Sequence, residues 1–117
     1  MSASQHAFIG IPGFASLTAQ TTGTGESIPI NASKQAMWEV QGVGTITSGE
    51  VKIETAGTFD YTGQWNEIGS VLGTDISGGK SLGGTYPAPP GNFMRARIST
   101  TIAGGGTTTA YLNSLLG

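Results

Sequence analysis

Strict alternation of apolar and polar residues is clearest near the C-terminus of the chain. Residues 93–100 alternate, and residues 107–112 alternate again after three glycines at 104–106. A period of two is typical of an antiparallel strand with one face on a core. The pattern therefore predicts two strands joined by a glycine hairpin. The face expected to be buried carries Met94, Ala96, Ile98, Thr100, Thr108, Ala110 and Leu112.

The middle of the chain contains two further alternating segments. Residues 35–41 place Trp38 on one face between two apolar residues. We expect Trp38 to anchor the core, because truncating a buried Trp typically costs about 3–5 kcal/mol. Residues 50–55 turn Val51 and Ile53 inward. The outward face of this segment carries Glu50, Lys52 and Glu54.

Two weaker segments complete the set of expected strands. Residues 64–72 form a strand region with Trp65 near its start, and residues 27–30 form a short strand. Pro29 confines the short strand to a sheet edge or a strand start. Six to eight strands separated by turn signals favour an all-β fold. We expect an antiparallel β-sandwich of immunoglobulin-like (Ig-like) or jelly-roll topology.

The first 26 residues have the polar, glycine-containing composition of an extended N-terminal arm. We therefore expect an arm over residues 1–26 and a β-sandwich domain over residues 27–117. An apolar island interrupts the arm, and it either packs on the domain's own core or docks on a neighbouring subunit. Its large apolar residues are Phe8, Ile9, Ile11 and Phe14.

Residues 73–91 are the longest stretch without a strand pattern. They are rich in glycine and end in Tyr86 followed by several prolines. Loops of this length are usually either functional or disordered. We expect this loop, including Tyr86, to supply a second contact with a partner.

Composition narrows the classes of function. The 117 residues fit one domain. Only 10% of the residues are charged, against about 25% in typical globular domains. The net charge of −2, with five scattered basic residues, gives no footprint for nucleic acid. Because cysteine is absent, we expect no disulfides. No apolar run approaches the roughly 20 residues that span a bilayer, so we expect no membrane partner. No signal peptide is visible at the N-terminus.

Short motifs that resemble catalytic signatures lack the context that their chemistry needs. Ser77 and Lys80 have the Ser-x-x-Lys spacing, but two glycines between them disfavour the helix that such a serine requires. The Gly-Lys-Ser at 79–81 lacks the glycine spacing of a phosphate-binding loop. His6, the only histidine, has no thiol or neighbouring carboxylate to build a zinc site. We expect no catalytic residues, no metal, no cofactor and no enzymatic activity.

Charged residues on the expected outer faces have several interpretations. Glu50 and Glu54 would lie roughly 13 Å apart along one strand, too far for a glycosidase pair, and a solvated sheet face is expected. Arg95 and Arg97 share one face of their strand, and guanidinium groups need carboxylate or carbonyl partners. They either pair with glutamates of the same outer face or form a subunit contact.

Three aromatic residues leave a further alternative open. Tyr61, Trp65 and Tyr86 would form a sugar-binding platform if their rings were exposed together, because aromatic faces bind sugar rings. Aromatic residues of small sandwiches more often pack in the core or at an interface. We expect the second arrangement.

Four segments between about residue 25 and residue 112 together resemble a known family. They are residues 37–45 around the first Trp, residues 51–69 leading to the second Trp, residues 93–98 and residues 105–112. They resemble the small β-sandwich virion proteins of tailed bacteriophages, the capsid decoration or cement proteins and related structural proteins. One departure is the Asp-Tyr-Thr-Gly at 60–63, where many such proteins have an Asn-Asp or Asp-Gly turn.

The resemblance implies a virion structural protein on the capsid exterior. Such a protein would bind the major capsid protein, often as a homotrimer, so that several small contacts add up. The expected subunit or capsid contacts are Phe8, Ile9, Ile11, Phe14, Tyr86, Arg95 and Arg97. Two alternatives stay open: a carbohydrate- or receptor-binding module of a phage fibre, and a minor head–tail or tail protein.

Overall fold

The structure is a computed structural model that describes residues 10–30, 33–86 and 93–116. These residues form eight strands and one short 3₁₀ turn, η2 (Gly73–Asp75). The strands are β1 (Gly10–Gln20), β2 (Ile28–Pro29), β3 (Ser33–Val43), β4 (Ser48–Ala56), β5 (Asn66–Leu72), β6 (Ser81–Tyr86), β7 (Phe93–Ala103) and β8 (Thr107–Leu116). Within the described ranges, no helix has the length and apolar character needed to cross a membrane.

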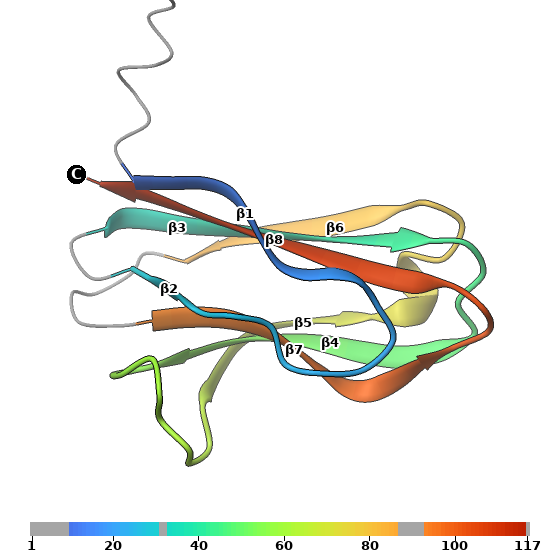
Figure 1. Cartoon of the computed structure of the whole chain (residues 1–117). Helices are drawn as coiled ribbons and strands as arrows, with labels where there is room; N and C mark the ends of the chain where they lie inside the picture. Colours follow the sequence, from blue (N-terminus) through green and yellow to red (C-terminus); the bar gives the residue numbers. More distant parts are fainter. Residues whose placement is uncertain (1–9, 31–32, 87–92, 117) are drawn as a thin grey trace, which may run out of the picture.

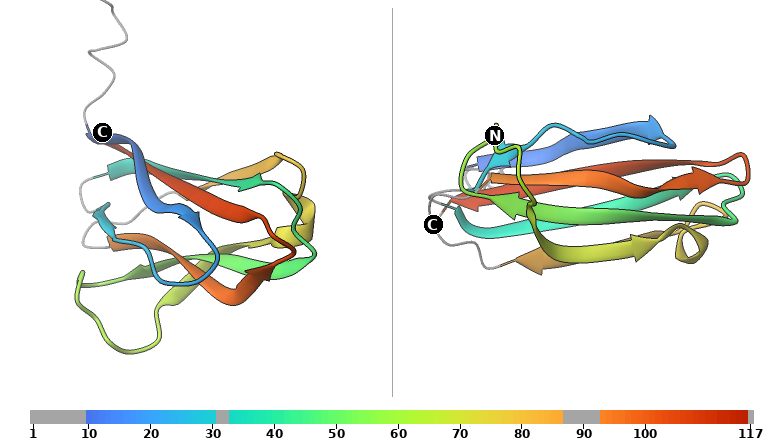
Figure 2. Two further views of the ribbon diagram at one scale, coloured as in Figure 1. Left: turned by 45° about the vertical axis from the view of Figure 1, so that its right-hand side comes forward. Right: turned by 90° about the horizontal axis from the view of Figure 1, so that it is seen from below.

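The eight strands pack as two four-stranded antiparallel sheets (Figures 1 and 2). One sheet has the order β1-β8-β3-β6, and the other has the order β2-β7-β4-β5. The first strand pairs with the eighth, the second with the seventh, the third with the sixth and the fourth with the fifth. This arrangement is the jelly-roll sandwich. The expected antiparallel β-sandwich is confirmed, and of the two expected topologies the chain adopts the jelly roll.

The predicted glycine hairpin near the C-terminus is wrong. Strand β7 pairs with β2 and β4, whereas β8 pairs with β1 and β3, so the two strands lie in opposite sheets. Residues 104–106 carry the chain between the sheets, and Gly104 and Gly105 have φ values of +110° and +100°. Side chains disfavour such values. Alternation around a glycine turn predicts two strands but not their pairing. Two consecutive strands show the same alternation of buried and exposed residues whether they pair within one sheet or face each other from opposite sheets.

The sandwich begins earlier than the expected boundary at residue 27. Residues 10–20 form β1, an edge strand that pairs with β8, and Leu17 is fully buried. Three register shifts along β1 break the period of two that would have marked it as a strand. Phe8 and Ile9 of the predicted arm lie outside the described residues.

The expectation that residues 73–91 lack strand structure is also wrong. Strand β6 lies within this stretch and pairs with β3. Two glycines in the middle of β6 remove the alternating pattern that would predict a strand, because glycine is depleted in strands. Contact with Trp38 explains one of them: a Cβ at Gly84 would lie 2.6 Å from Cζ2 of Trp38, and a Cβ at Gly69 on β5 would lie 2.7 Å from it. The indole therefore packs against both β5 and β6.

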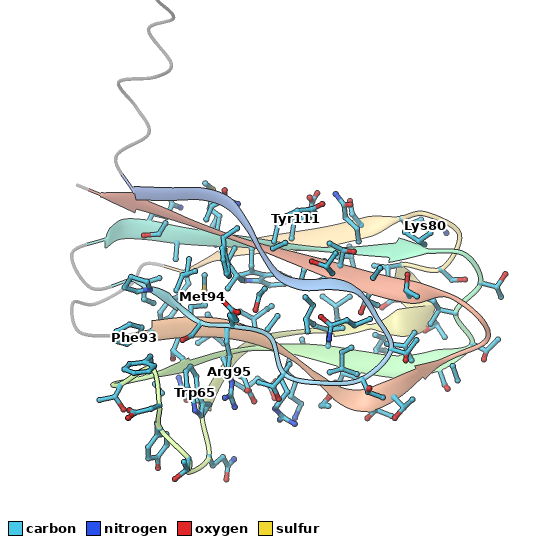
Figure 3. All side chains as sticks on the ribbon, viewed as in Figure 1. Trp65, Lys80, Phe93, Met94, Arg95 and Tyr111 are labelled. Atoms are coloured by element: carbon cyan, nitrogen blue, oxygen red, sulfur yellow. The ribbon has the colours of Figure 1, made fainter. Side chains whose placement is uncertain are left out.

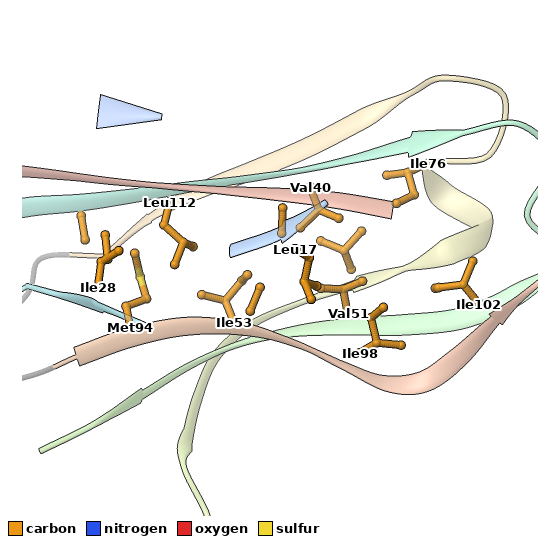
Figure 4. Close-up of a cluster of buried hydrophobic side chains, with 14 of the residues drawn as sticks. Leu17, Ile28, Val40, Val51, Ile53, Ile76, Met94, Ile98, Ile102 and Leu112 are labelled. Atoms are coloured by element: carbon orange, nitrogen blue, oxygen red, sulfur yellow. The ribbon is translucent and has the colours of Figure 1, made fainter. Parts of the chain in front are cut away.

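The hydrophobic core fills the space between the sheets (Figure 4). It includes Leu17, Ile28, Ile30, Ala36, Val40, Ile46, Val51, Ile53, Val71, Ile76, Met94, Ala96, Ile98, Ile102, Ala110 and Leu112. The inward faces predicted for β4, β7 and β8 are confirmed, except that Thr100 is exposed beside a register shift opposite Glu50. Trp38 packs against this core as predicted, although its side chain is only partly buried.

The strands run between two ends of the sandwich (Figure 1), and the residues of these two ends differ in composition. We call one of them the glycine end: it carries the β3–β4, β5–β6 and β7–β8 connections, residues 44–47, 73–80 and 104–106. We call the other the aromatic end: there the β4–β5 loop, residues 57–65, lies near the end of β6 and the start of β7. The aromatic end is defined by Phe59, Tyr61, Trp65, Tyr86 and Phe93.

Candidate functional site

The β4–β5 loop projects from the sandwich at the aromatic end (Figure 1). Residues 57–64 are all exposed, including Phe59 at 68% and Tyr61 at 49%. The ring of Phe59 makes an edge-on contact with Phe93, with 6.1 Å between the ring centroids. Binding residues are often found on loops that a rigid sheet positions. The loop is therefore the first candidate for a binding site.

Trp65 fixes this loop to the sheet beneath it. Its side chain is 3% exposed, and its indole Nε1 donates a hydrogen bond to the carbonyl of Tyr61 at 2.8 Å. Arg95 on β7 covers the indole, with Cζ 3.9 Å from the ring centroid (Figure 3). The electron-rich face of an indole attracts a guanidinium group. Trp65 is thus the covered base of the loop and contributes no exposed platform.

Glu54 holds Arg95 in this position. Its Oε1 accepts hydrogen bonds from Nε of Arg95 and Nε of Arg97, each at 3.1 Å, and its Oε2 accepts one from Nη2 of Arg97 at 2.9 Å. Glu54 lies directly opposite Arg95 in the β4–β7 pair, the geometry in which cross-strand pairs interact. The hydrogen bond with Glu54 raises the pKa of Arg97 above its ordinary value.

This cluster decides between the interpretations of the outer face. The expected solvated face is wrong at Glu54, which is 3% exposed because the two arginines cover it. Arg95 and Arg97 pair with a glutamate of their own face, which was one of the two alternatives. Their role in a subunit contact stays a prediction.

The other predicted contact residues are spread over the molecule. Phe14 on β1 and Tyr86 on β6 are partly buried against the domain's own core. Ile11 lies on β1 opposite Ser114, and its side chain is outside the described part of the structure. Of the predicted contacts whose side chains the structure describes, Phe14 and Tyr86 pack against the core while Arg95 and Arg97 pair with Glu54 on the outer face of β7, so these four do not form one surface.

Two clefts flank the β4–β5 loop. The smaller has a volume of about 330 Å³ and is lined by Gly25, Glu26, Ser27, Phe59 and Arg95. The larger has a volume of about 510 Å³ and is lined by Thr55, Ala56, Gly57, Thr58, Tyr61, Gln64, Asn66 and Tyr86. Both volumes lie in the range of about 300–1,000 Å³ that is usual for small-molecule sites.

No protein-family model matches the chain, and no curated protein matches it. In the described ranges, no group of three or more His, Cys, Asp or Glu side chains is placed to hold a metal ion.

Sequence reasoning missed the exposed apolar residues of the glycine end, and at the aromatic end it missed Phe59 while naming Tyr61 as part of a possible platform. At the glycine end, Val43, Leu72 and Leu82 are exposed close to the ends of their strands. Alternation does not fix the direction of a side chain where a strand stops, which is why these residues gave no signal. At the aromatic end, Phe59 and Tyr61 flank Asp60 in a short loop between two strands, and that spacing is the signal that could have located the site.

Proposed function

We propose that the chain is a structural binding protein of a virion, of the capsid decoration type, and that it binds the major capsid protein. The observation that carries the proposal is a jelly-roll sandwich in which three aliphatic residues close to the glycine-end termini of their strands, Val43, Leu72 and Leu82, are exposed. A β-sandwich is the architecture that the resemblance implies, and jelly rolls recur in viral capsid proteins. This support from the fold is an analogy, because one fold hosts many functions.

The glycine end is the proposed capsid-binding surface. Its connections are hydrogen-bonded to one another: the Gly78 N–H donates to the carbonyl of Gly44 at 2.9 Å, and the Gly106 N–H donates to the carbonyl of Thr45 at 2.8 Å. The Ile46 N–H also donates to the hydroxyl of Ser77 at 2.9 Å. A surface that is already rigid loses little conformational entropy when it binds. The exposed Val43, Leu72 and Leu82 supply its apolar contacts.

Each such contact is small, and we propose that a homotrimer raises the overall affinity for the capsid by making three of them. A symmetric oligomer presents three copies of the same surface, so the second and third contacts form at high effective concentration. Light scattering at micromolar concentration should give three times the chain mass of 11.9 kDa. A monomer under these conditions would contradict the trimeric form of the proposal.

Co-sedimentation with capsids tests the proposal. The capsids are assembled from the major capsid protein encoded in the same genome. The wild-type chain should sediment with them at a saturating stoichiometry, and the triple variant V43T/L72T/L82T should stay in the supernatant. Threonine keeps β propensity at these exposed positions, so the variant should fold. Phe59→Ala at the other end is the matched control and should bind like the wild type. Absence of wild-type binding, or full binding by the triple variant, overturns the proposal.

The predicted contacts in the N-terminal segment need a separate truncation. Deleting residues 1–9 leaves β1 intact and removes Phe8 and Ile9. Deleting residues 1–20 would remove β1 and the buried Leu17, and would confuse loss of binding with loss of the fold. The shorter truncation should weaken capsid binding at an unchanged urea midpoint. Unchanged binding would show that the segment contributes no contact.

A further inference from the structure

We propose that the larger cleft beside the β4–β5 loop binds a neutral saccharide. The proposal goes beyond capsid attachment, because it assigns a ligand to the opposite end of the molecule. Tyr61, Tyr86 and a set of uncharged polar side chains meet in this cleft.

The two tyrosines supply the apolar surface. Tyr61 comes from the loop and is 49% exposed, while Tyr86 comes from the end of β6 and is packed partly against the core. They are brought together from positions 25 residues apart in the chain to line a single cleft. Aromatic rings present a flat apolar face with a polar tip, which suits a sugar ring that has one C–H face and a rim of hydroxyls.

The polar side chains of the cleft match sugar hydroxyls. Gln64 and Asn66 line it together with Thr58. Within the described part of the chain, neither amide side chain is hydrogen-bonded to another residue. Each amide offers two donors and one acceptor oxygen. Adjacent sugar hydroxyls, which both donate and accept, would satisfy these groups.

The absence of charge in the lining selects the class of saccharide. Of the described residues that line this cleft, none is Asp, Glu, Lys, Arg or His. The arginines close to the loop are held by Glu54 on the outer face of the sheet. Anionic ligands are usually recognised by arginine or lysine. The lining therefore suits a neutral sugar and not a sialylated, sulfated or phosphorylated one.

Tyr61 is held in place before any ligand arrives. The hydrogen bond from Trp65 fixes its carbonyl, and its ring lies so close to Gly63 that a Cβ there would collide with the phenol. Gly63 does not have a positive φ, so alanine fits the backbone at that position. Gly63→Ala would therefore shift the Tyr61 ring without removing it.

A glycan array that carries neutral, sialylated and sulfated oligosaccharides tests the proposal. The best neutral glycan is then titrated by calorimetry against the wild type and its variants. We expect Tyr61→Ala to weaken binding by about tenfold or more. Phe59→Ala, on the same loop but outside this cleft, should bind within about twofold of the wild type. Absence of any bound glycan, or binding to anionic glycans alone, overturns the proposal.

Gly63→Ala tests whether the position of the Tyr61 ring matters for binding, because this variant shifts the ring but does not remove it. It should weaken glycan binding while the urea midpoint and the capsid binding stay unchanged. Equal losses in Tyr61→Ala and Phe59→Ala would contradict the assignment to this cleft. Tyr61→Ala should also sediment with capsids like the wild type, so failure of the saccharide proposal and failure of the capsid proposal give different results.

Discussion

The two ends of this sandwich are built differently, although the same strands run through both. At the glycine end, backbone meets backbone: a Cβ at Gly106 would lie 2.5 Å from the carbonyl oxygen of Val43. At the aromatic end, one loop depends on a side-chain anchor, in which Trp65 is covered by Arg95 and Arg95 is held by Glu54. The close packing of the glycine end therefore requires glycine, which has no side chain. The position of the β4–β5 loop at the aromatic end requires the side chains of Trp65, Arg95 and Glu54.

This difference distinguishes the two binding surfaces that we propose. A set of turns joined by hydrogen bonds gives a rigid end, suited to a protein partner. A loop that stands on an anchor leaves recesses at its sides, suited to a small ligand. The jelly roll keeps the two surfaces at opposite ends of the same strands.

The largest effect is expected from adding one methyl group at the glycine end. Gly42→Ala places a Cβ against the backbone carbonyl of Ile76. We expect it to lower the free energy of unfolding by about 3 kcal/mol, the upper end of the usual cost of overpacking. Urea denaturation measures the loss.

Gly57→Ala at the aromatic end is the matched control. A Cβ there would meet no described atom within 4 Å, and the backbone φ is not positive. The change should be neutral or stabilise the chain by up to about 1 kcal/mol. Similar decreases in the free energy of unfolding for Gly42→Ala and Gly57→Ala would contradict the proposed difference between the two ends.

The next effect concerns the charge beneath the loop. Glu54→Gln leaves Arg95 and Arg97 without their carboxylate, and should cost about 2–3 kcal/mol. This is below the about 3–5 kcal/mol of a fully buried pair because both arginines keep some solvent access. Glu67→Gln, which removes an exposed partner of Lys52, should cost clearly less than Glu54→Gln, because solvent screens an exposed ion pair. If urea denaturation gave equal losses of stability for Glu54→Gln and Glu67→Gln, Glu54 would stabilise the fold no more than an exposed surface glutamate does.

A smaller effect should follow from removing one hydrogen bond of the anchor. Trp65→Phe keeps an aromatic ring under Arg95 but deletes the donor to the Tyr61 carbonyl. We expect a loss of about 1 kcal/mol and faster hydrogen–deuterium exchange in residues 57–64. Exchange at residues 104–106 should not change. A uniform increase across both ends would contradict a local anchor.

The smallest effect is a titration. Glu67 accepts a hydrogen bond from Nζ of Lys52 at 3.0 Å and raises the pKa of Lys52 above its ordinary value of 10.5. Since the folded chain holds this proton more tightly than the unfolded chain, the stabilisation is complete below pH 10.5 and is lost as the pH rises through the raised pKa. In Glu67→Gln, NMR titration should move the pKa of Lys52 back toward 10.5. An unmoved pKa would show that the pair is not formed in solution.

Much of the fold could be predicted from the sequence because its long strands obey a period of two. The buried faces around Met94, Ile53 and Leu112 follow directly from alternation. Strands β1 and β6 could not be predicted in this way, because bulges interrupt the first, and the second carries two glycines, of which Gly84 accommodates the Trp38 ring. The pairing of β7 and β8 with other strands is a long-range property that no local pattern contains.

The candidate sites were less predictable than the fold. The pairing of Arg95 and Arg97 with a glutamate was one of two expected arrangements, but the burial of Glu54 depends on strands far apart in sequence. The meeting of Tyr61 with Tyr86 was considered as part of an exposed platform. It occurs without Trp65, because the indole turns under the loop to hold it. Which aromatic residue anchors and which is exposed depends on the neighbouring strand, and the sequence alone does not supply that.

Hydrogen–deuterium exchange of the capsid-bound protein tests most directly whether the two ends have separate tasks. We predict slower exchange on capsids at residues 43–47 and 72–82, with residues 57–64 exchanging as in the free protein. Protection confined to residues 57–64, with the glycine end unchanged, would contradict it.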